Sequence, residues 1–200
     1  MINIGLVPCV TEKYRNQFEY SVDIRWYKFL NKAFKKPNIE ILSKNFKNKK
    51  INLIILTGGN NLKSFSKRKI DEVRANLDKF YLDISVKKKI PLVGICYGAQ
   101  FIAKYFNNKI YKTKKHVGAH KLKIINSSFN KEKKIFKVNS YHDYCIKNLN
   151  KKFETIGLAP DKTIEFFKIK KLKLYGIMWH PERNIFLKDL DLHIFKKICS

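Results

Sequence analysis

The sequence predicts an α/β fold: helices flank a mostly parallel central sheet, and a smaller antiparallel extension occupies the C-terminal half. In the first half, apolar runs rich in β-branched residues alternate with segments whose apolar residues recur at helical spacing, as in parallel α/β sheets. In the second half, short strand-like runs follow one another between polar turns, as in antiparallel sheets. The chain has 200 residues, 44% of them hydrophobic, so we expect one domain over residues 1–200 around one substantial core.

The first half is expected to alternate strands and helices. The strands are predicted over residues 2–7, 39–42, 51–56 and 92–95, where apolar and β-branched side chains cluster. The helices are predicted over residues 23–34 (ending near Pro37), 69–88 and 100–106, from apolar residues at helical spacing.

The second half is expected to contain short strands followed by a closing helix. Each strand-like run is bounded by polar turn residues, which favours antiparallel pairing between neighbours. The predicted strands cover residues 110–111, 120–125, 135–139, 153–158, 163–169 and 174–179, and the helix covers about 186–198.

Composition limits where the protein works and what it binds. No apolar run of roughly 18 residues and no signal peptide is found, so we expect a cytoplasmic protein without membrane contact. The four cysteines (Cys9, Cys96, Cys145 and Cys199) lack paired or metal-site spacing, which predicts reduced thiols and no metal or cofactor. The formal net charge of +27 comes mostly from scattered lysines, which favours a general lysine bias over a nucleic-acid surface. A positive field would still help to capture a small anionic substrate.

A candidate nucleophile lies where a predicted strand turns sharply into a predicted helix. The segment Gly94-Ile95-Cys96-Tyr97-Gly98-Ala99-Gln100 directly follows the apolar run Pro91-Leu92-Val93. A Gly-x-Cys-x-Gly turn of this kind strains its central residue, and the flanking glycines leave room for the turn. The helix N-terminus then directs N–H groups and a positive dipole end at the sulfur, which favours a thiolate. Cys96 is therefore the predicted nucleophile.

Partners for this cysteine are expected at the ends of two other strands. The run Tyr175-Gly176-Ile177-Met178-Trp179 is followed by His180-Pro181-Glu182, and the proline fixes the direction in which the backbone leaves the strand. Alternate residues of an extended chain point the same way, so Glu182 can lie behind the imidazole and orient it. After the strand predicted over residues 51–56, Thr57-Gly58-Gly59-Asn60 can offer a backbone N–H to an oxyanion.

Three blocks of the chain resemble the class I (triad-type) glutamine amidotransferases, in their order and separation as well as in their residues. They are Gly94 to Gln100, Val138-Asn139-Ser140-Tyr141-His142, and Gly176 to Glu182. The last two blocks are most similar to the γ-glutamyl hydrolase branch, the peptidase C26 group. The resemblance covers essentially the whole chain and implies the flavodoxin-like fold of this family.

The resemblance implies a role for each matching residue of the reacting centre. Cys96 would be the nucleophile, His180 its base and later its acid, and Glu182 the group that orients the imidazole. The backbone N–H groups of Gly59 and Tyr97 would form the oxyanion hole. The implied reaction is hydrolysis of a γ-glutamyl amide through a γ-glutamyl thioester, with release of L-glutamate.

The resemblance also implies a pocket for the glutamyl group. Gln100 and the backbone of Ser140, Tyr141 and His142 would hold its α-amino and α-carboxylate groups. We expect the His142 side chain to support this pocket rather than to transfer protons.

The group on the leaving nitrogen is not encoded in these blocks. The small, lysine-rich chain is similar to the hydrolases of bacterial capsule phosphoramidate synthesis, which cut γ-glutamyl-CDP-amidate (CDP-linked glutamine) into glutamate and cytidine diphosphoramidate. The alternatives are a glutaminase subunit that feeds ammonia to a separate synthase, a hydrolase of another γ-glutamyl conjugate, and a non-enzymatic glutamyl-binding module. The sequence has no appended synthase domain, which favours a free-standing hydrolase, and the intact Cys-His-Glu set argues against a mere binding module.

Two further pairs of residues admit both a functional and a structural interpretation. His116 and His120 suggest a metal pair, but they lack a cysteine or carboxylate partner at metal-site spacing, so we expect a turn before a strand instead. Arg25 and Trp26 follow the first strand, near the edge where open parallel sheets bind ligands. Ordinary helix packing is favoured for this pair over substrate contact.

Overall fold

The computed structural model describes residues 1–45, 50–113, 116–126, 128–129, 135–184 and 189–199, and a nine-stranded sheet organises them. Five strands form its parallel part. In sheet order they are β4 (Asn38–Ile41), β1 (Asn3–Val7), β5 (Leu53–Leu56), β6 (Leu92–Ile95) and β13 (Leu174–Ile177). Each coincides with a predicted strand to within two residues at either end, and the parallel pairing confirms the predicted α/β class.

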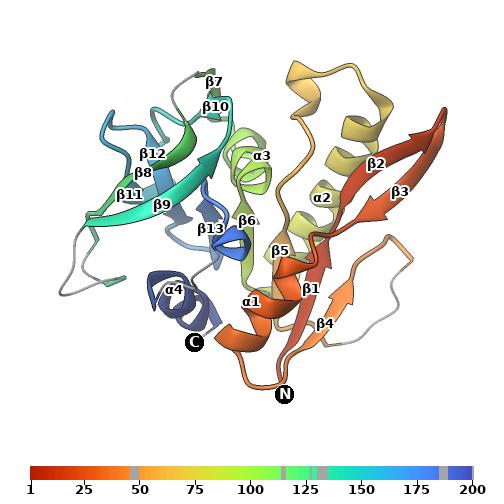
Figure 1. Cartoon of the computed structure of the whole chain (residues 1–200), viewed down its shortest axis with the longest axis horizontal. Helices are drawn as coiled ribbons and strands as arrows, with labels where there is room; N and C mark the ends of the chain where they lie inside the picture. Colours follow the sequence, from red (N-terminus) through yellow and green to blue (C-terminus); the bar gives the residue numbers. More distant parts are fainter. Residues whose placement is uncertain (46–49, 114–115, 127, 130–134, 185–188, 200) are drawn as a thin grey trace.

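The second half of the chain extends the same sheet with antiparallel strands (Figure 1). Strand β13 pairs in parallel with β6 on one side and antiparallel with the extension on the other. Beyond β13 the order is β12 (Ile164–Ile169), β11 (Phe153–Leu158), β8 (Val117–Ile124) and β9 (Ile135–Tyr141). The predicted antiparallel extension is therefore confirmed, and β13 is the border strand between the two parts.

Helices cover both faces of the parallel part. Helices α1 (Arg25–Ala33) and α4 (Asp189–Cys199) pack on one face, while α2 (Lys69–Lys88) and α3 (Tyr97–Tyr105) pack on the other (Figure 1). Within β5, Leu53 and Ile55 point toward α1 and α4, whereas Ile54 and Leu56 point toward α2 and α3. This strand is apolar throughout because both of its faces are buried.

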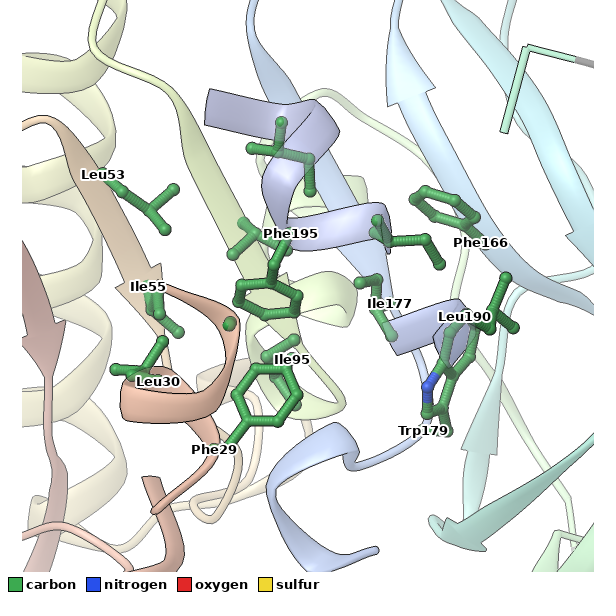
Figure 2. Packing of buried hydrophobic residues seen from close by; sticks show 14 of the residues in the cluster. Phe29, Leu30, Leu53, Ile55, Ile95, Phe166, Ile177, Trp179, Leu190 and Phe195 are labelled. Atoms are coloured by element: carbon green, nitrogen blue, oxygen red, sulfur yellow. The ribbon is translucent and has the colours of Figure 1, made fainter. Parts of the chain in front are cut away.

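Aromatic side chains fix α1 and α4 to the sheet. Figure 2 shows Phe29 of α1 and Phe195 of α4 beside Ile55 and Ile95, and the two phenyl rings meet edge to face with centroids 4.8 Å apart. Trp26 is 1% exposed in the same cluster, which agrees with the helix packing expected for it. Full burial of each such side chain contributes about 1.5–3 kcal/mol to stability.

Several local features differ from the sequence prediction. An unpredicted hairpin, β2 (Cys9–Tyr14) and β3 (Gln17–Ser21), follows β1, and β7 (Tyr111–Lys112) pairs with β10 (Tyr144–Cys145) rather than with the large sheet. Helix α3 begins at Tyr97, three residues earlier than predicted. The predicted start of the last helix, residues 186–188, lies outside the described residues.

Two findings concern membranes and disulfides. None of the helices in the described ranges is both long and apolar enough to cross a membrane. All four cysteines are free thiols, and two of them, Cys96 and Cys145, are buried.

Candidate active site

Cys96 lies in a strained turn between β6 and α3. Its backbone has φ +51° and ψ −103°, and its N–H donates to the Ile177 carbonyl of β13 at 2.7 Å. A Cβ on Gly94 would lie 2.4 Å from the Gly98 backbone, and a Cβ on Gly98 would lie 2.4 Å from the Leu56 carbonyl oxygen. Only glycine fits at these two positions, so the predicted Gly-x-Cys-x-Gly elbow is confirmed in its geometry.

The elbow places the sulfur at the N-terminal end of α3. Cys96 is the residue before the helix and Tyr97 is its first residue, so the backbone N–H of Tyr97 has no acceptor within the helix. Helix N-termini of this kind stabilise negative charge. The Tyr97 side chain itself points into the core, 5.0 Å from the guanidinium carbon of Arg74.

His180 reaches the cysteine because its strand is the neighbour of β6. Gly176 and Ile177 of β13 pair with Gly94 and Ile95, and the chain continues to His180 within three residues. The His180 Nδ1 lies 2.6 Å from Oε1 of Glu182, and the two residues are 2% and 4% exposed.

Electrostatics favour a protonated imidazole at this point. Burial opposes the charge on His180, but hydrogen bonds with Cys96 and with Glu182 outweigh it and raise the pKa of His180 to about 9. At neutral pH the imidazole is therefore protonated on both nitrogens, with one N–H facing the Glu182 carboxylate and the other facing the Cys96 sulfur. An activated thiol requires a partner of this kind.

Asn139 holds His180 in place, although the sequence prediction did not name it as a site residue. Its Nδ2 donates to the His180 carbonyl at 2.7 Å, and its Oδ1 accepts from the His180 N–H at 2.8 Å. This amide therefore joins β9 to the end of β13. Its position next to Ser140 in the second sequence block was the signal that could have found it.

The loop after β5 passes directly over the imidazole. A Cβ on Gly58 would lie 2.5 Å from Cε1 of His180, so the Gly58 backbone contacts the ring. Gly59 has φ +128°, a conformation that L side chains rarely adopt. Arg74 Nη2 donates to the Thr57 carbonyl at 2.8 Å, and Asn60 pairs with both backbone groups of Val10 at 2.8 Å. Hydrogen bonds at its first and last residues, Thr57 and Asn60, therefore hold the predicted oxyanion loop in place.

Two of the residues predicted to bind the glutamyl group meet at one carbonyl. Gln100 Nε2 donates to the Tyr144 oxygen at 3.4 Å, and Nδ1 of His142 lies 2.8 Å from the same oxygen. Tyr141 is half exposed, and its ring centroid lies 5.8 Å from that of His180. The C-terminal end of β9 therefore lies beside His180.

Other groups of this segment are engaged within the protein. The Ser140 hydroxyl donates to the His116 carbonyl at 2.8 Å, and the His142 N–H donates to the same oxygen at 3.1 Å. The His142 side chain faces Glu165, with Nε2 3.6 Å from Oε1. The role of His142 in a glutamyl pocket stays a prediction.

His116 and His120 have a carboxylate neighbour in space that spacing along the sequence did not indicate. Glu165 of β12 lies 3.3 Å from Nδ1 of His116 and 3.6 Å from Nε2 of His120. Spacing along the chain could not indicate this carboxylate, because pairing of distant strands brings it to the histidines. Together with His142 these residues offer four ligand atoms within 4.8 Å of one another, which is a group able to hold a metal ion.

Comparisons with known proteins agree with this architecture. The family model described as glutamine amidotransferase class-I matches residues 12–196. The chain is 36% identical over 173 residues to the gamma-glutamyl-CDP-amidate hydrolase of Campylobacter jejuni subsp. jejuni serotype O:2, covering 86% of this chain and 73% of that protein.

A second relative and a solved structure extend the comparison. The chain is 29% identical over 180 residues to a subunit of the glutamine-hydrolyzing GMP synthase from Methanococcus aeolicus, covering 88% of this chain and 87% of that protein. A crystal structure of a glutamine amidotransferase from Thermotoga maritima has the same fold, with a TM-score of 0.70 and 16% identity over 98% of this chain and 83% of that one. The chain is therefore an enzyme of the class I glutamine amidotransferase family.

Proposed function

We propose that the protein hydrolyses a γ-glutamyl amide through a thioester on Cys96 and releases L-glutamate. The buried Cys96–His180–Glu182 arrangement carries this proposal, because the imidazole is hydrogen-bonded to both other members. The thiolate attacks the γ-carbonyl, and His180 gives its proton to the departing nitrogen. His180 then takes a proton from water, and the resulting hydroxide attacks the thioester carbonyl. The C–S bond breaks, which releases glutamate and returns Cys96 to a thiolate beside protonated His180.

The oxyanion of each tetrahedral intermediate is assigned to the backbone N–H groups of Tyr97 and Gly59. Removing one donor from comparable sites costs about 2.7–4 kcal/mol of transition-state stabilisation. Support comes from the position of Tyr97 at the start of α3 and from the bracing of the Gly59 loop by Arg74 and Asn60.

The glutamyl group is assigned to Gln100 and to the backbone of Ser140, Tyr141 and His142. Gln100 supports this assignment because its amide reaches the carbonyl that also fixes His142. The proposed chemistry uses side chains and backbone groups alone, without a metal or other cofactor, and one domain over residues 1–200 would contain all of it.

As substrate we propose γ-glutamyl-CDP-amidate, which would give cytidine diphosphoramidate for capsule modification, a cytoplasmic reaction. The 36% identical relative bears the name gamma-glutamyl-CDP-amidate hydrolase, and the net charge of +27 suits a pyrophosphate. Membership of the peptidase C26 branch stays a prediction.

A second candidate function is an ammonia-producing subunit that serves a separate synthase. The relative from Methanococcus aeolicus is named as one subunit of a synthase, which is the observation that favours this candidate. Another γ-glutamyl conjugate would fit the same triad.

One substrate screen separates these functions. Release of glutamate is measured from γ-glutamyl-CDP-amidate, free glutamine and other γ-glutamyl amides. We expect kcat/KM to be at least about 100-fold higher for the CDP conjugate than for glutamine, because binding energy from the nucleotide can be used in the transition state. A preference for glutamine over every conjugate would overturn the CDP-amidate proposal.

Two cysteine variants test the mechanism in the same assay. Cys96→Ala is expected to abolish glutamate release, while Cys199→Ala, which removes a thiol at the end of α4, is expected to retain it. Unchanged turnover of Cys96→Ala would overturn the thioester mechanism.

A further inference from the structure

We propose that His116, His120, His142 and Glu165 form a binding site for a transition-metal dication, with Zn²⁺ as the preferred ion. The site lies in the antiparallel extension and uses residues from three strands or their ends: His116 directly precedes β8, His120 lies within it, His142 directly follows β9, and Glu165 lies in β12. It is separate from the hydrolytic chemistry of Cys96.

The spacing of the ligand atoms matches a shared ion better than direct hydrogen bonds. The nitrogens of His116, His120 and His142 that face Glu165 lie 3.3, 3.6 and 3.6 Å from its oxygens. Hydrogen bonds between such atoms are usually about 2.7–3.2 Å long. In a tetrahedral zinc site with ligand distances of about 2.0–2.2 Å, neighbouring ligand atoms are about 3.3–3.5 Å apart.

Each histidine has a second contact that fixes which nitrogen faces the centre. In all three, the outer ring nitrogen lies within hydrogen-bond distance of an oxygen that can only accept, so the proton belongs on that nitrogen and the inner one presents a lone pair. The acceptors for His116, His120 and His142 are the Asp161 carboxylate at 3.0 Å, the Lys121 carbonyl at 3.0 Å and the Tyr144 carbonyl at 2.8 Å. Acceptors of this kind orient metal-ligating histidines in known sites.

The inner atoms have no other partner among the described residues. Nδ1 of His116, Nε2 of His120, Nε2 of His142 and both oxygens of Glu165 are buried without a hydrogen bond. Glu165 is 0% exposed, and His116 and His142 are each 3% exposed. A buried carboxylate facing three lone pairs is unfavourable unless a cation lies between them.

A proton on His116 is the competing explanation. The neighbouring carboxylates of Glu165 and Asp161, against the effect of burial, raise the pKa of His116 to about 9. That proton would satisfy one contact to Glu165, but it would leave the lone pairs of His120 and His142 without a donor. A dication would satisfy all four ligands at once.

The donor set indicates both the ion and its role. Three imidazoles and one carboxylate in a compact group suit Zn²⁺, and four protein ligands leave no open position for a substrate, as in structural zinc sites. The ion would fix the β8–β9 hairpin against β12. The Glu165 carbonyl accepts from the Met178 N–H at 2.8 Å, two residues before His180, so the site also supports the strand that carries the base.

The test measures metal content and needs no turnover, so its outcome is independent of the proposed hydrolysis. A Cys96→Ser background prevents zinc uptake by the active-site thiol. The protein is stripped with a chelator, loaded with Zn²⁺, desalted and analysed by mass spectrometry of the metal. We expect about one equivalent of zinc per chain, and intense visible absorption typical of tetrahedral cobalt after loading with Co²⁺.

A matched pair of histidine variants identifies the ligands. In the same background, His120→Ala should retain less than about a tenth of the zinc, because it removes one of four ligands. His193→Ala, an exposed histidine of α4, should retain one equivalent. His120 is chosen because its side chain is 16% exposed, which makes a folded variant easiest to obtain.

If His120→Ala does not fold, as judged by near-ultraviolet circular dichroism, Asp161→Asn takes its place. This variant keeps all four ligands and should weaken zinc affinity by about 10–100-fold, the usual effect of losing such a partner. The proposal is overturned if the Cys96→Ser protein retains less than about a tenth of an equivalent. It is also overturned if folded His120→Ala retains as much zinc as His193→Ala, or if Asp161→Asn binds zinc as tightly as its parent.

Discussion

At the residue scale, the reactivity that we propose for Cys96 depends on the short contact between His180 and Glu182. The carboxylate oxygen lies 2.6 Å from Nδ1, which directs Nε2 toward the sulfur. Glu182→Gln keeps the shape of the side chain but removes its charge, so it no longer stabilises the imidazolium. We expect kcat to fall by roughly 10²–10⁴ while the circular dichroism spectrum is unchanged. Glu72→Gln, on the exposed side of α2, is the control, and a kcat within twofold of wild type in Glu182→Gln would contradict the assigned role.

The pH dependence of activity follows from the same contact. The pKa of His180 is raised from 6.5 to about 9, so the protonated form persists through neutral pH and is lost as the pH rises through about 9. Because this proton goes to the leaving nitrogen, kcat/KM should decline on the alkaline side, above about pH 9. In Glu182→Gln one cause of the raised pKa is absent, so the decline should begin at lower pH. Profiles of kcat/KM against pH that coincide for the two proteins would contradict this explanation.

At the element scale, α2 supports the loop that covers the active site through one buried side chain. Arg74 pairs with Asp78 at 2.8 Å, and both side chains are 0% exposed. Its guanidinium also donates to the Thr57 carbonyl. Arg74→Leu leaves Asp78 buried without its cation, and we expect the free energy of unfolding in urea to fall by about 3–5 kcal/mol.

A double variant separates stability from positioning in this helix. Arg74→Leu with Asp78→Leu removes both charges and should recover most of the stability, since an apolar pair is tolerated in place of a buried ion pair. We expect kcat to be lower than in the wild type in both Arg74→Leu and the double variant, because the Thr57 carbonyl has lost its donor in each. Lys79→Leu, which breaks the exposed Lys79–Asp83 pair of the same helix, should leave the urea midpoint unchanged. Full recovery of kcat in the double variant would show that Arg74 does not position the loop.

Elements were predictable from the sequence where one or both faces are buried. The strands β5 and β6 are apolar throughout because helices cover both sides, and such runs are easily recognised. Hairpin β2–β3 was missed because most of its side chains are exposed and give no buried alternation. Asn16 in its turn has φ +65°, a conformation that asparagine tolerates, and this residue was the available signal.

The site was only partly predictable for a related reason. Cys96, His180 and Glu182 stand in short blocks whose local geometry follows from their glycines and proline, so these residues could be named from the sequence. Asn139 and Glu165 contact residues that lie far away in the chain. The place of Asn139 beside Ser140 in the second block was the signal for it, whereas nothing in local spacing indicates the contacts of Glu165. The structure was needed to pair Glu165 with the histidines.

At the scale of the whole molecule, the excess of positive charge should affect substrate capture. The formal net charge is +27, and a field of this sign accelerates association with anions at low salt. We expect kcat/KM for γ-glutamyl-CDP-amidate to fall several-fold as NaCl rises from about 50 to about 500 mM, because salt screens this attraction. Free glutamine carries no net charge and serves as the matched control. An equal decrease for both substrates would contradict electrostatic capture.

The place of β13 in the sheet has a consequence for how the enzyme is made. It is the last described strand of the chain, yet it lies between β6 and β12 in the middle of the sheet. During synthesis on the ribosome, Cys96 emerges long before His180 and Glu182, and domains complete their folding only when their distant segments are available. The nascent chain therefore carries Cys96 without its proposed base until residues 174–182 have been made. We expect the reactive arrangement to form late, when β13 pairs with β6 and β12.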